Sequence, residues 1–533
     1  AMKFSKKILP MVLAMAMVPA MSMLAFADDI QVTTPQTAQY SITITNAHGT
    51  YKAYQIFSGD LPSDGKPSNV EWGSGVTPFS YHNKNDAVDI AKELEGKGND
   101  SAEAISFAEL AKNNIKQDLQ SATAQTNSET GKAVLNNLSA GYYVIVNSDV
   151  TGNQSVSKYI LQVTGNQDVA NKAEVPTFEK KLKDKNESEG TITDWQDSAD
   201  YDIGDDVPFK LEGVVAANYA DYKGPYKFVF HDKAEESLTF KDDTVKVSVD
   251  GTTITAGTDT YQLNTTPSDG CTFEVTFPNL KNIKDSKTGE GLVHAGSKIT
   301  VEYNATLNRQ AALGSQGNVN QGKLQFSNNP YDTQGGDTGE TPWDNVIVFT
   351  YKVVVNKYAN EVSPTTKLTG AEFTLEKKIK DKNSAADTWI PIQHVETEAT
   401  SVFTFKGLDD GEYRLTETTT PQGYNTIDPI SFTVTAGHID TWTGQDRTSI
   451  LTDLQGTDKN TAEGQITFTA TKTTNNNKET FNGDLSTNVI NKSGSLLPST
   501  GGIGTTIFYI VGVVLVLGAG VLLVTKKRMN ADK

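Results

Sequence analysis

The sequence has little of what disulfide, metal and phosphate chemistry needs. Its single cysteine, Cys271, excludes an intrachain disulfide, although disulfides are the usual covalent staple of exported proteins. The histidines show no metal-ligand spacing, and no glycine-rich phosphate loop is present. These histidines are His48, His82, His231, His294, His394 and His438. We therefore expect no metal and no cofactor, and we expect Cys271 to be a buried thiol rather than a nucleophile.

Basic residues are also in short supply. The 533-residue chain has 47 Lys and Arg against 65 Asp and Glu, a formal net charge of −18. Nucleic acid is not expected as a partner, because neutralising phosphates requires clustered basic side chains. Carboxylates are plentiful, but no acid–base pair typical of a glycosidase stands out. The composition predicts an acidic, soluble outer surface.

Long hydrophobic runs occur only near the two ends. Lys3, Lys6 and Lys7 precede an apolar run over residues 8–24 that closes on Ala-Phe-Ala, the order of a secretory signal peptide covering residues 1–27. Residues 507–524 are all apolar or glycine, and a Lys-Lys-Arg cluster follows at 526–528. This pattern predicts a C-terminal transmembrane helix with its end in the cytoplasm. We therefore expect an exported chain.

The roughly 470 residues between these ends suit about three domains of ordinary size. Short alternating segments rich in Thr, Val and Tyr predict half-buried strands and a mainly β architecture of tandem immunoglobulin-like sandwiches. Examples are Tyr40–Thr45, Tyr143–Val146, Phe228–Phe230, Phe273–Phe277 and Ile430–Val434. Residues 86–116 are the exception, because helical spacing there predicts one or two helices inserted in the first domain.

A weak internal repeat suggests where the domains meet. Residues 137–147 align with residues 407–417, each a glycine-bearing turn that feeds a strand. Two related sandwiches would then flank a different middle one, with joints near 171–175 and near 350. We expect domains over 28–173, 174–350 and 351–494, followed by a C-terminal segment over 495–533.

Strand alternation directs an unusual set of side chains inward in the last domain. Lys357 shares a face with Val353 and Val355, Glu417 shares one with Leu415, and Asn491 shares one with Val489. Burial disfavours charge, so the lysine can lose a proton and the acid can gain one. A neutral amine could then attack the carboxamide and expel ammonia. The product would be a Lys357–Asn491 amide, with Glu417 in the catalytic role. The alternative is that these are ordinary residues at strand ends.

Three motifs carry a resemblance to a known family. Residues 415–424, LTETTTPQGY, resemble the "E-box" of B-type collagen-adhesin domains in Gram-positive pilins, and residues 370–373, GAEF, resemble the motif after their reactive lysine strand. Leu497, Pro498, Ser499, Thr500 and Gly501 match the LPxTG sortase signal. This resemblance implies a sortase-assembled backbone pilin, cleaved between Thr500 and Gly501 and held as a thioacyl intermediate until an amine releases it.

The resemblance also points to the amine that accepts Thr500. Backbone pilins carry a lysine in a Tyr-Pro-Lys-like pilin motif at the exit of the first domain, and Lys172 occupies that position, with Ala170 and Asn171 in place of Tyr-Pro. Lys172 also lies in a predicted exposed joint. The implied partners are pilus-specific and housekeeping sortases, other copies of the chain, minor pilins and peptidoglycan.

The middle domain offers a second candidate cross-link. Alternation turns Lys180 inward with Phe178 and Leu182, and Asp232 inward with Phe230. This lysine–aspartate pair resembles A-type collagen-adhesin domains, which use Asp as the catalytic acid. Asn320 and Asn328 both have the parity of the strand that would supply the asparagine. Alternation cannot separate them, and we prefer Asn320, at the start of the strand.

The first domain has no counterpart. Asn147 replaces Glu417 in the internal alignment and the opening strand lacks a lysine, so we expect no cross-link there. The resulting expectation is a surface pilus subunit covalently attached to the cell wall. The alternatives are a monomeric wall-anchored adhesin that binds host matrix or glycan and, less favoured, a secreted hydrolase on the same anchor.

Overall fold

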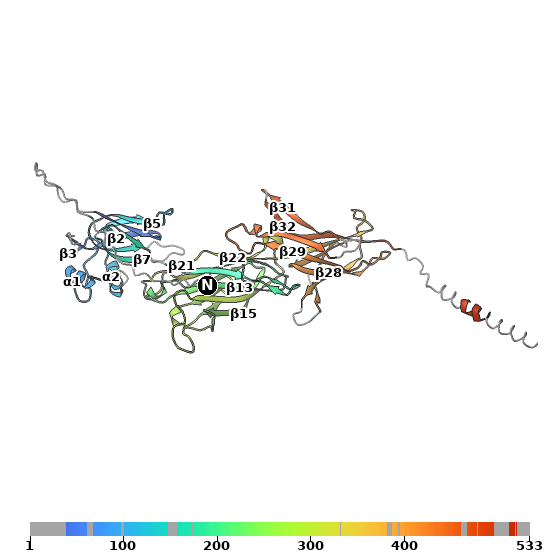
Figure 1. Ribbon diagram of the computed structural model, residues 1–533, viewed down its shortest axis with the longest axis horizontal. Helices are drawn as coiled ribbons and strands as arrows, with labels where there is room; N and C mark the ends of the chain where they lie inside the picture. Colours follow the sequence, from blue (N-terminus) through green and yellow to red (C-terminus); the bar gives the residue numbers. More distant parts are fainter. Residues whose placement is uncertain are drawn as a thin grey trace, which may run out of the picture.

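The computed structural model describes residues 39–60, 68–97, 101–147, 157–163, 165–171, 174–330, 332–380, 386–392, 395–399, 401–459, 466–476, 478–494, 511–517 and 519. Over these residues the chain is mainly β, as predicted. Its sheets fall into three groups that follow one another along the long axis of the molecule (Figure 1). We call them the N-terminal, central and C-terminal groups.

The N-terminal group consists of a small sheet in the order β5-β1-β8 and a larger one in the order β3-β2-β6-β7, with β4 beside β2. Two short helices lie beside the larger sheet, which confirms the predicted helical insertion. The helices are α1 (Ala87–Leu94) and α2 (Ala102–Asn113). The strands are β1 (Tyr40–Thr45), β2 (Thr50–Asp60), β3 (Ser68–Trp72), β4 (Ala122–Gln125), β5 (Lys132–Leu138), β6 (Gly141–Asn147), β7 (Ser157–Val163) and β8 (Gln167–Ala170).

Sequence signals explain where both helices begin. Asp86 caps α1 by accepting from the Val88 N–H at 2.9 Å, and Ser101 caps α2 by accepting from the Ala104 N–H at 3.1 Å. Short polar side chains at this position satisfy N–H groups that have no partner within the helix. Ile90 and Leu94 on α1 and Phe107 on α2 then pack into the same buried core as Phe57 of β2.

The central group pairs two main sheets around one aromatic-rich core. Their orders are β16-β15-β19-β13-β9 and β12-β22-β20-β14-β18-β17, with β21 beside β20. The strands are β9 (Thr177–Leu182), β10 (Lys185–Asn186), β11 (Thr191–Ile192), β12 (Ser198–Asp200), β13 (Asp206–Val214), β14 (Phe228–Ala234), β15 (Leu238–Val249), β16 (Thr252–Ile254), β17 (Gln262–Asn264), β18 (Phe273–Phe277), β19 (Lys298–Leu307), β20 (Asn318–Ser327), β21 (Thr338–Glu340) and β22 (Asp344–Phe349).

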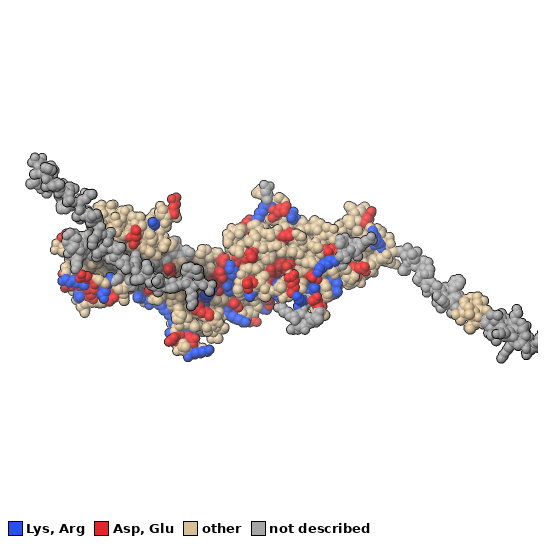
Figure 2. Space-filling model, viewed as in Figure 1, with Lys and Arg blue, Asp and Glu red and all other residues tan. Residues whose placement is uncertain are grey.

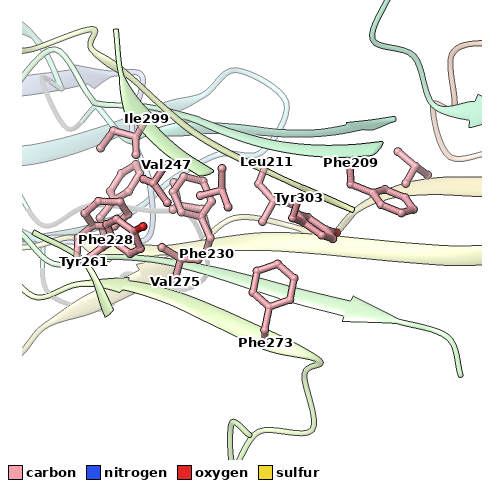
Figure 3. Close-up of a cluster of buried hydrophobic side chains, with 14 of the residues drawn as sticks. Phe209, Leu211, Phe228, Phe230, Val247, Tyr261, Phe273, Val275, Ile299 and Tyr303 are labelled. Atoms are coloured by element: carbon pink, nitrogen blue, oxygen red, sulfur yellow. The ribbon is translucent and has the colours of Figure 1, made fainter. Parts of the chain in front are cut away.

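Alternation builds this core. Every second residue of β18, namely Phe273, Val275 and Phe277, is buried, and β14 adds Phe228 and Phe230. Figure 3 shows Phe228, Phe230, Phe273 and Val275 on one side of the core, and Phe209, Leu211 and Tyr303 from the opposite sheet on the other. Burial of this apolar area is the main stabilising contribution to such a sandwich.

The C-terminal group has two five-stranded sheets, in the orders β26-β27-β23-β32-β31 and β25-β24-β28-β29-β30. Its strands are β23 (Tyr351–Ala359), β24 (Glu372–Ile379), β25 (Thr388–Pro391), β26 (Val395–Ala399), β27 (Val402–Leu408), β28 (Gly411–Thr419), β29 (Ile430–His438), β30 (Leu451–Asp458), β31 (Thr469–Asn475) and β32 (Lys478–Asn491). Among the described residues, no helix is long and apolar enough to cross a membrane. Residues 511–517 are helical, and most of the predicted span over 507–524 lies outside the described residues.

Acidic and basic side chains are interspersed over the face of the molecule shown in Figure 2. Among the described residues of that face, the basic side chains form no continuous patch of the kind that a nucleic acid would require.

Candidate functional site

Lys357, Glu417 and Asn491 meet in the interior of the C-terminal group, and we call them the C-terminal triad. β23 and β32 run parallel as neighbours, with Lys357 opposite Val489 and Ala359 opposite Asn491. Glu417 comes from β28 in the facing sheet. Lys357 and Asn491 are 0% exposed and the Glu417 side chain is also 0% exposed, so the cluster is sealed from solvent.

The carboxylate of this triad touches both nitrogen atoms. Lys357 Nζ lies 3.2 Å from Glu417 Oε1, while Asn491 Nδ2 donates to Oε1 and Oε2, each at 3.0 Å. The Phe373 ring lies below the lysine, with 5.3 Å between Nζ and the ring centroid. Burial lowers the pKa of Lys357, although Glu417 opposes this shift. Glu417 is therefore placed to exchange protons with either nitrogen.

Lys180, Asp232 and Asn320 form a comparable central triad. β14 and β20 are neighbours in one sheet, with Ala234 opposite Asn320, and β9 carries Lys180 from the facing sheet. All three residues are 0% exposed, and Lys180 Nζ contacts Asp232 Oδ2 directly. Burial lowers the pKa of Lys180 and raises that of Asp232, and each partner opposes the shift of the other. Both shifts favour the neutral amine and the neutral acid.

Tyr303 joins this triad and was missed in the sequence analysis. Its hydroxyl donates to Asp232 Oδ2 and accepts from Lys180 Nζ at 2.8 Å and from Asn320 Nδ2 at 2.9 Å. Its ring stacks on Phe209 at 5.4 Å and meets the edge of Phe273 at 4.8 Å, so the hydroxyl is held in place (Figure 3). The alternation of β19 could have placed Tyr303 in the interior, but it could not show which polar group the hydroxyl meets.

The two candidate asparagines of β20 lie in different surroundings. Asn320 contacts the Tyr303 hydroxyl within the central triad. Asn328 follows the end of β20, and its backbone N–H bonds to the Asp337 carbonyl at 3.3 Å. The geometry thus favours Asn320, whose role in a bond stays a prediction.

The N-terminal group has no comparable arrangement among its described residues. Every lysine whose side chain is described there is partly or fully exposed. Asn147, the counterpart of Glu417, is buried and donates to the His48 carbonyl. Lys172, the sorting residues 497–501 and the predicted signal peptide 1–27 lie outside the described residues.

A third buried lysine, Lys377, was also missed. It lies where the C-terminal group contacts the central group, with Nζ 2.7 Å from Asp202 and 3.0 Å from Glu187, and it also contacts Asp409. Burial would lower the pKa of Lys377, but the three carboxylates raise it well above its usual value. Lys377 and Lys185 outweigh burial at Glu187 and lower its pKa to about 2. Lys377 and Glu187 therefore form an ion pair, whereas burial raises the pKa of Asp409 well above its usual range.

Two family descriptions match the chain. Residues 352–448 match the SpaA prealbumin-like fold domain, and residues 490–531 match the LPXTG cell wall anchor motif. The first match contains Lys357 and Glu417, while the second includes Asn491 and the predicted sorting signal. The anchor motif indicates a secreted protein that is attached covalently to the cell wall.

The chain is also similar to streptococcal and corynebacterial surface proteins. It is 26% identical over 271 residues to the trypsin-resistant surface T6 protein of Streptococcus pyogenes, an alignment that spans 43% of this chain and 48% of that relative. The T6 backbone pilin structure covers 87% of this chain and all of its own, with a TM-score of 0.52 and 18% identity. The major pilin SpaD of Corynebacterium diphtheriae gives a TM-score of 0.47 at 16% identity over 87% of this chain and 99% of its own. The T6 likeness shows the fold.

Proposed function

We propose that this chain is the backbone subunit of a covalently polymerised pilus, stabilised by two intramolecular Lys–Asn isopeptide bonds. The observation that carries the proposal is the pair of buried lysine–carboxylate–asparagine triads, one in each of two successive sandwiches that precede a cell wall anchor motif. The similarity to the T6 protein and to the T6 backbone pilin supports the same role. We infer a structural subunit rather than an enzyme that turns over a substrate.

The geometry of the C-terminal triad suits bond formation. Lys357 Nζ, once neutral, attacks Asn491 Cγ, and the proton that Nζ releases passes to Glu417. Glu417 protonates Nδ2, to which both of its oxygens lie at 3.0 Å, and the Cγ–Nδ2 bond breaks. One C–N bond forms, one breaks, and ammonia leaves, so Glu417 ends in its starting state.

The central triad would follow the same chemistry with one added group. Asp232 accepts the proton from Lys180, while Tyr303 lies between the acid and Asn320 Nδ2, the departing nitrogen. We assign Tyr303 as the positioning and proton-relaying group of this reaction. The amide that forms would be uncharged, so the desolvation cost of the lysine–aspartate pair would disappear with it.

Polymerisation would use the C-terminal sorting signal and the lysine that follows the N-terminal group. A sortase would cleave after Thr500 and join it to Lys172 of the next subunit. Further partners would be minor pilins, with a housekeeping sortase joining the finished polymer to peptidoglycan.

Mass spectrometry of the purified full chain tests the internal bonds. The proposal expects a mass two ammonia molecules below that of the sequence, with branched peptides linking Lys180 to Asn320 and Lys357 to Asn491. Glu417→Ala should retain only the central bond, because its C-terminal triad lacks the proton-transfer group. An unmodified parent mass would contradict the internal chemistry.

Immunoblots of cell-wall extracts test polymerisation. Cells that make the unaltered chain should show a high-mass covalent ladder, and Lys172→Ala should abolish it. Lys132→Ala, which removes an exposed lysine of β5, is the matched control and should leave the ladder intact. A parent that is anchored without a ladder would instead indicate a monomeric surface adhesin. A ladder unchanged in Lys172→Ala would show that another lysine accepts Thr500.

A further inference from the structure

Three ligand-type side chains converge where the central and C-terminal groups meet. Asp184 and Asp200 come from the central group, and His438 ends β29 of the C-terminal group. One ligand atom from each lies within 4.8 Å of the other two. Because His438 lies more than 200 residues after the two aspartates, no spacing rule could have revealed the cluster.

Asp200 is the least satisfied member of this cluster. The residue is only 1% exposed, and neither carboxylate oxygen makes a hydrogen bond of good geometry, although the neighbouring Tyr351 hydroxyl interacts with the carboxylate. A buried carboxylate without a well-formed hydrogen bond is costly unless a proton or a cation compensates it.

The hydrogen bonds around His438 determine which ring nitrogen faces the acids. Ser198 Oγ lies 2.6 Å from the Ile439 carbonyl, which can only accept, so the serine proton is committed there. Ser198 Oγ must then accept from His438 Nδ1, 2.7 Å away. In the neutral ring, Nε2 therefore carries a lone pair. That lone pair faces Asp184 Oδ2 at 3.3 Å, where two acceptors meet with no proton between them.

We propose that Asp184, Asp200 and His438 bind one divalent transition-metal ion, such as Zn²⁺, between the central and C-terminal groups. Imidazole and carboxylate donors suit such ions, whereas Ca²⁺ prefers an all-oxygen shell. Two ligands of a tetrahedral zinc lie about 3.3 Å apart, which matches the His438–Asp184 separation. The Nδ1–H bond to Ser198 is the outer contact that typically fixes the ring of a metal-bound histidine. The ion would join the two groups and does not depend on the proposed polymerisation.

Zinc titration of the chelator-treated full chain in detergent tests the site. Isothermal titration calorimetry should detect Zn²⁺ binding that His438→Gln and Asp200→Asn each weaken at least tenfold. Each variant should also bind one tightly held zinc ion fewer per chain than the parent. Ca²⁺ at the same concentrations should not displace it. Thermal melting should show a zinc-dependent rise in the parent that both variants lose.

His82→Gln is the matched control, because His82 also contacts a carboxylate, Glu93 at 2.6 Å, but lies on the surface of the N-terminal group. It should keep the same number of tightly bound ions as the parent. Circular dichroism spectra recorded without metal show whether each variant is folded. If His438→Gln or Asp200→Asn is not folded, Asp184→Asn is tested in its place. A parent that binds no zinc, or binding unchanged in the His438 and Asp200 variants, would overturn the proposal. The first of these results would mean that a proton on Nε2 balances Asp184.

Discussion

Burial alone does not decide what a lysine can do in this protein; the number of carboxylates around it does. Lys180 and Lys357 each contact one acid, and burial lowers the pKa of both amines. Lys377 is buried to a similar degree but contacts Asp202, Glu187 and Asp409, and its pKa is raised. A protonated amine has no lone pair with which to attack a carboxamide. We therefore expect Lys377 to stay an ion-pairing residue.

Tyr303→Phe tests the relay assigned to the hydroxyl. The variant keeps the stacked ring but removes the group between Asp232 and Asn320. We expect central bond formation to slow at least tenfold, while the Lys357–Asn491 bond forms as in the parent. A time course of intact mass after synthesis measures both. Tyr201→Phe, which loses a hydrogen bond to the Lys183 carbonyl at 2.6 Å but lies outside the triad, should form both bonds at the parent rate. If the Lys180–Asn320 bond forms at the same rate in Tyr303→Phe and Tyr201→Phe, the Tyr303 hydroxyl has no role in the reaction.

Asp205→Asn should change how stability depends on pH. Burial, with Asp202 and Glu187 nearby, raises the pKa of Asp205 from 3.8 to about 6. Between these values the folded state holds a proton that the unfolded state releases, so this contribution to stability is lost as pH rises through the window. Asp205→Asn has no carboxyl group at this position, so its stability does not fall with pH for this reason. Its stability relative to the parent should therefore improve by about 1 kcal/mol from pH 5 to pH 8, after allowing for partial solvent exposure.

Urea unfolding at the two pH values measures this difference. Asp206→Asn is the control, because hydrogen bonds from Lys241 and Thr306 outweigh burial and lower the pKa of Asp206. That carboxylate is ionised at both pH values and loses its stabilising effect only as the pH falls below its unfolded pKa of about 4. Its variant should therefore be weaker than the parent by the same amount at pH 5 and at pH 8. An equal relative gain from pH 5 to pH 8 in both variants would contradict the assignment.

At the scale of the strand, period-two alternation predicted the inward residues of β23 and β32, whereas residues 228–232 of β14 are all buried. Val353, Val355 and Lys357 of β23 are buried, as are Lys180 of β9 and Asn491 of β32. Alternation assigns a residue to a face but does not determine which strands become neighbours. The Tyr303 hydroxyl, the Lys377 cluster and the approach of His438 to Asp184 all depend on pairing and packing between distant strands. The sequence could therefore predict the lysine and acid of each triad and Asn491, and could narrow the central asparagine to Asn320 or Asn328, but it could not predict Tyr303 or the contacts between groups.

Gly322 tests how closely β9 must approach β20. It lies opposite Asp232, and a Cβ there would sit 2.9 Å from Phe178 Cζ and 3.1 Å from Leu211 Cδ2. Gly322→Ala should push β9 away, lower stability by about 1–3 kcal/mol and slow the Lys180–Asn320 reaction. Gly291→Ala is the control, because a Cβ there meets nothing within 4 Å. Thermal melting and the mass time course report the two effects. If Gly322→Ala and Gly291→Ala have the same melting temperature and the same rate of bond formation, the core accommodates the extra methyl group without moving Lys180.

At the scale of the whole molecule, the central and C-terminal groups share polar and close backbone contacts. The contacts include Asp409 N–H to Asp202 at 3.0 Å, Trp442 N–H to Asp197 at 2.8 Å and Phe481 N–H to Ser315 at 2.9 Å. At Gly483 an added Cβ would meet the backbone nitrogen of Gly314 at 2.4 Å, so only glycine allows this approach. These contacts favour transmission of load from one sandwich to the next as a unit.

The proposed linkage also defines a path for tension. If subunits join through Lys172 and Thr500, the pull enters at residue 172, crosses from Lys180 to Asn320, continues to Lys357, crosses to Asn491 and leaves at residue 500. Residues 181–319 and 358–490 are then bypassed by the two amides. With this linkage, the N-terminal group would precede the attachment point and carry no load, so it would not need a buried lysine, and its described lysine side chains are all partly or fully exposed.

Single-molecule pulling on the full chain tests this path. With Lys172→Cys and Thr500→Cys as attachment points and Cys271→Ser to remove the native thiol, the parent should show no large unfolding step. Lys180→Ala should release residues 181–319 and add about 450 Å of extension, because an extended chain spans about 3.3 Å per residue. Lys357→Ala should release the other loop with a step of similar size, and the double variant should show both. Steps of this length in the parent would mean that the loops bear load and that the amides are not in the path. In every variant the N-terminal group should add no step, since tension that enters at residue 172 never reaches it.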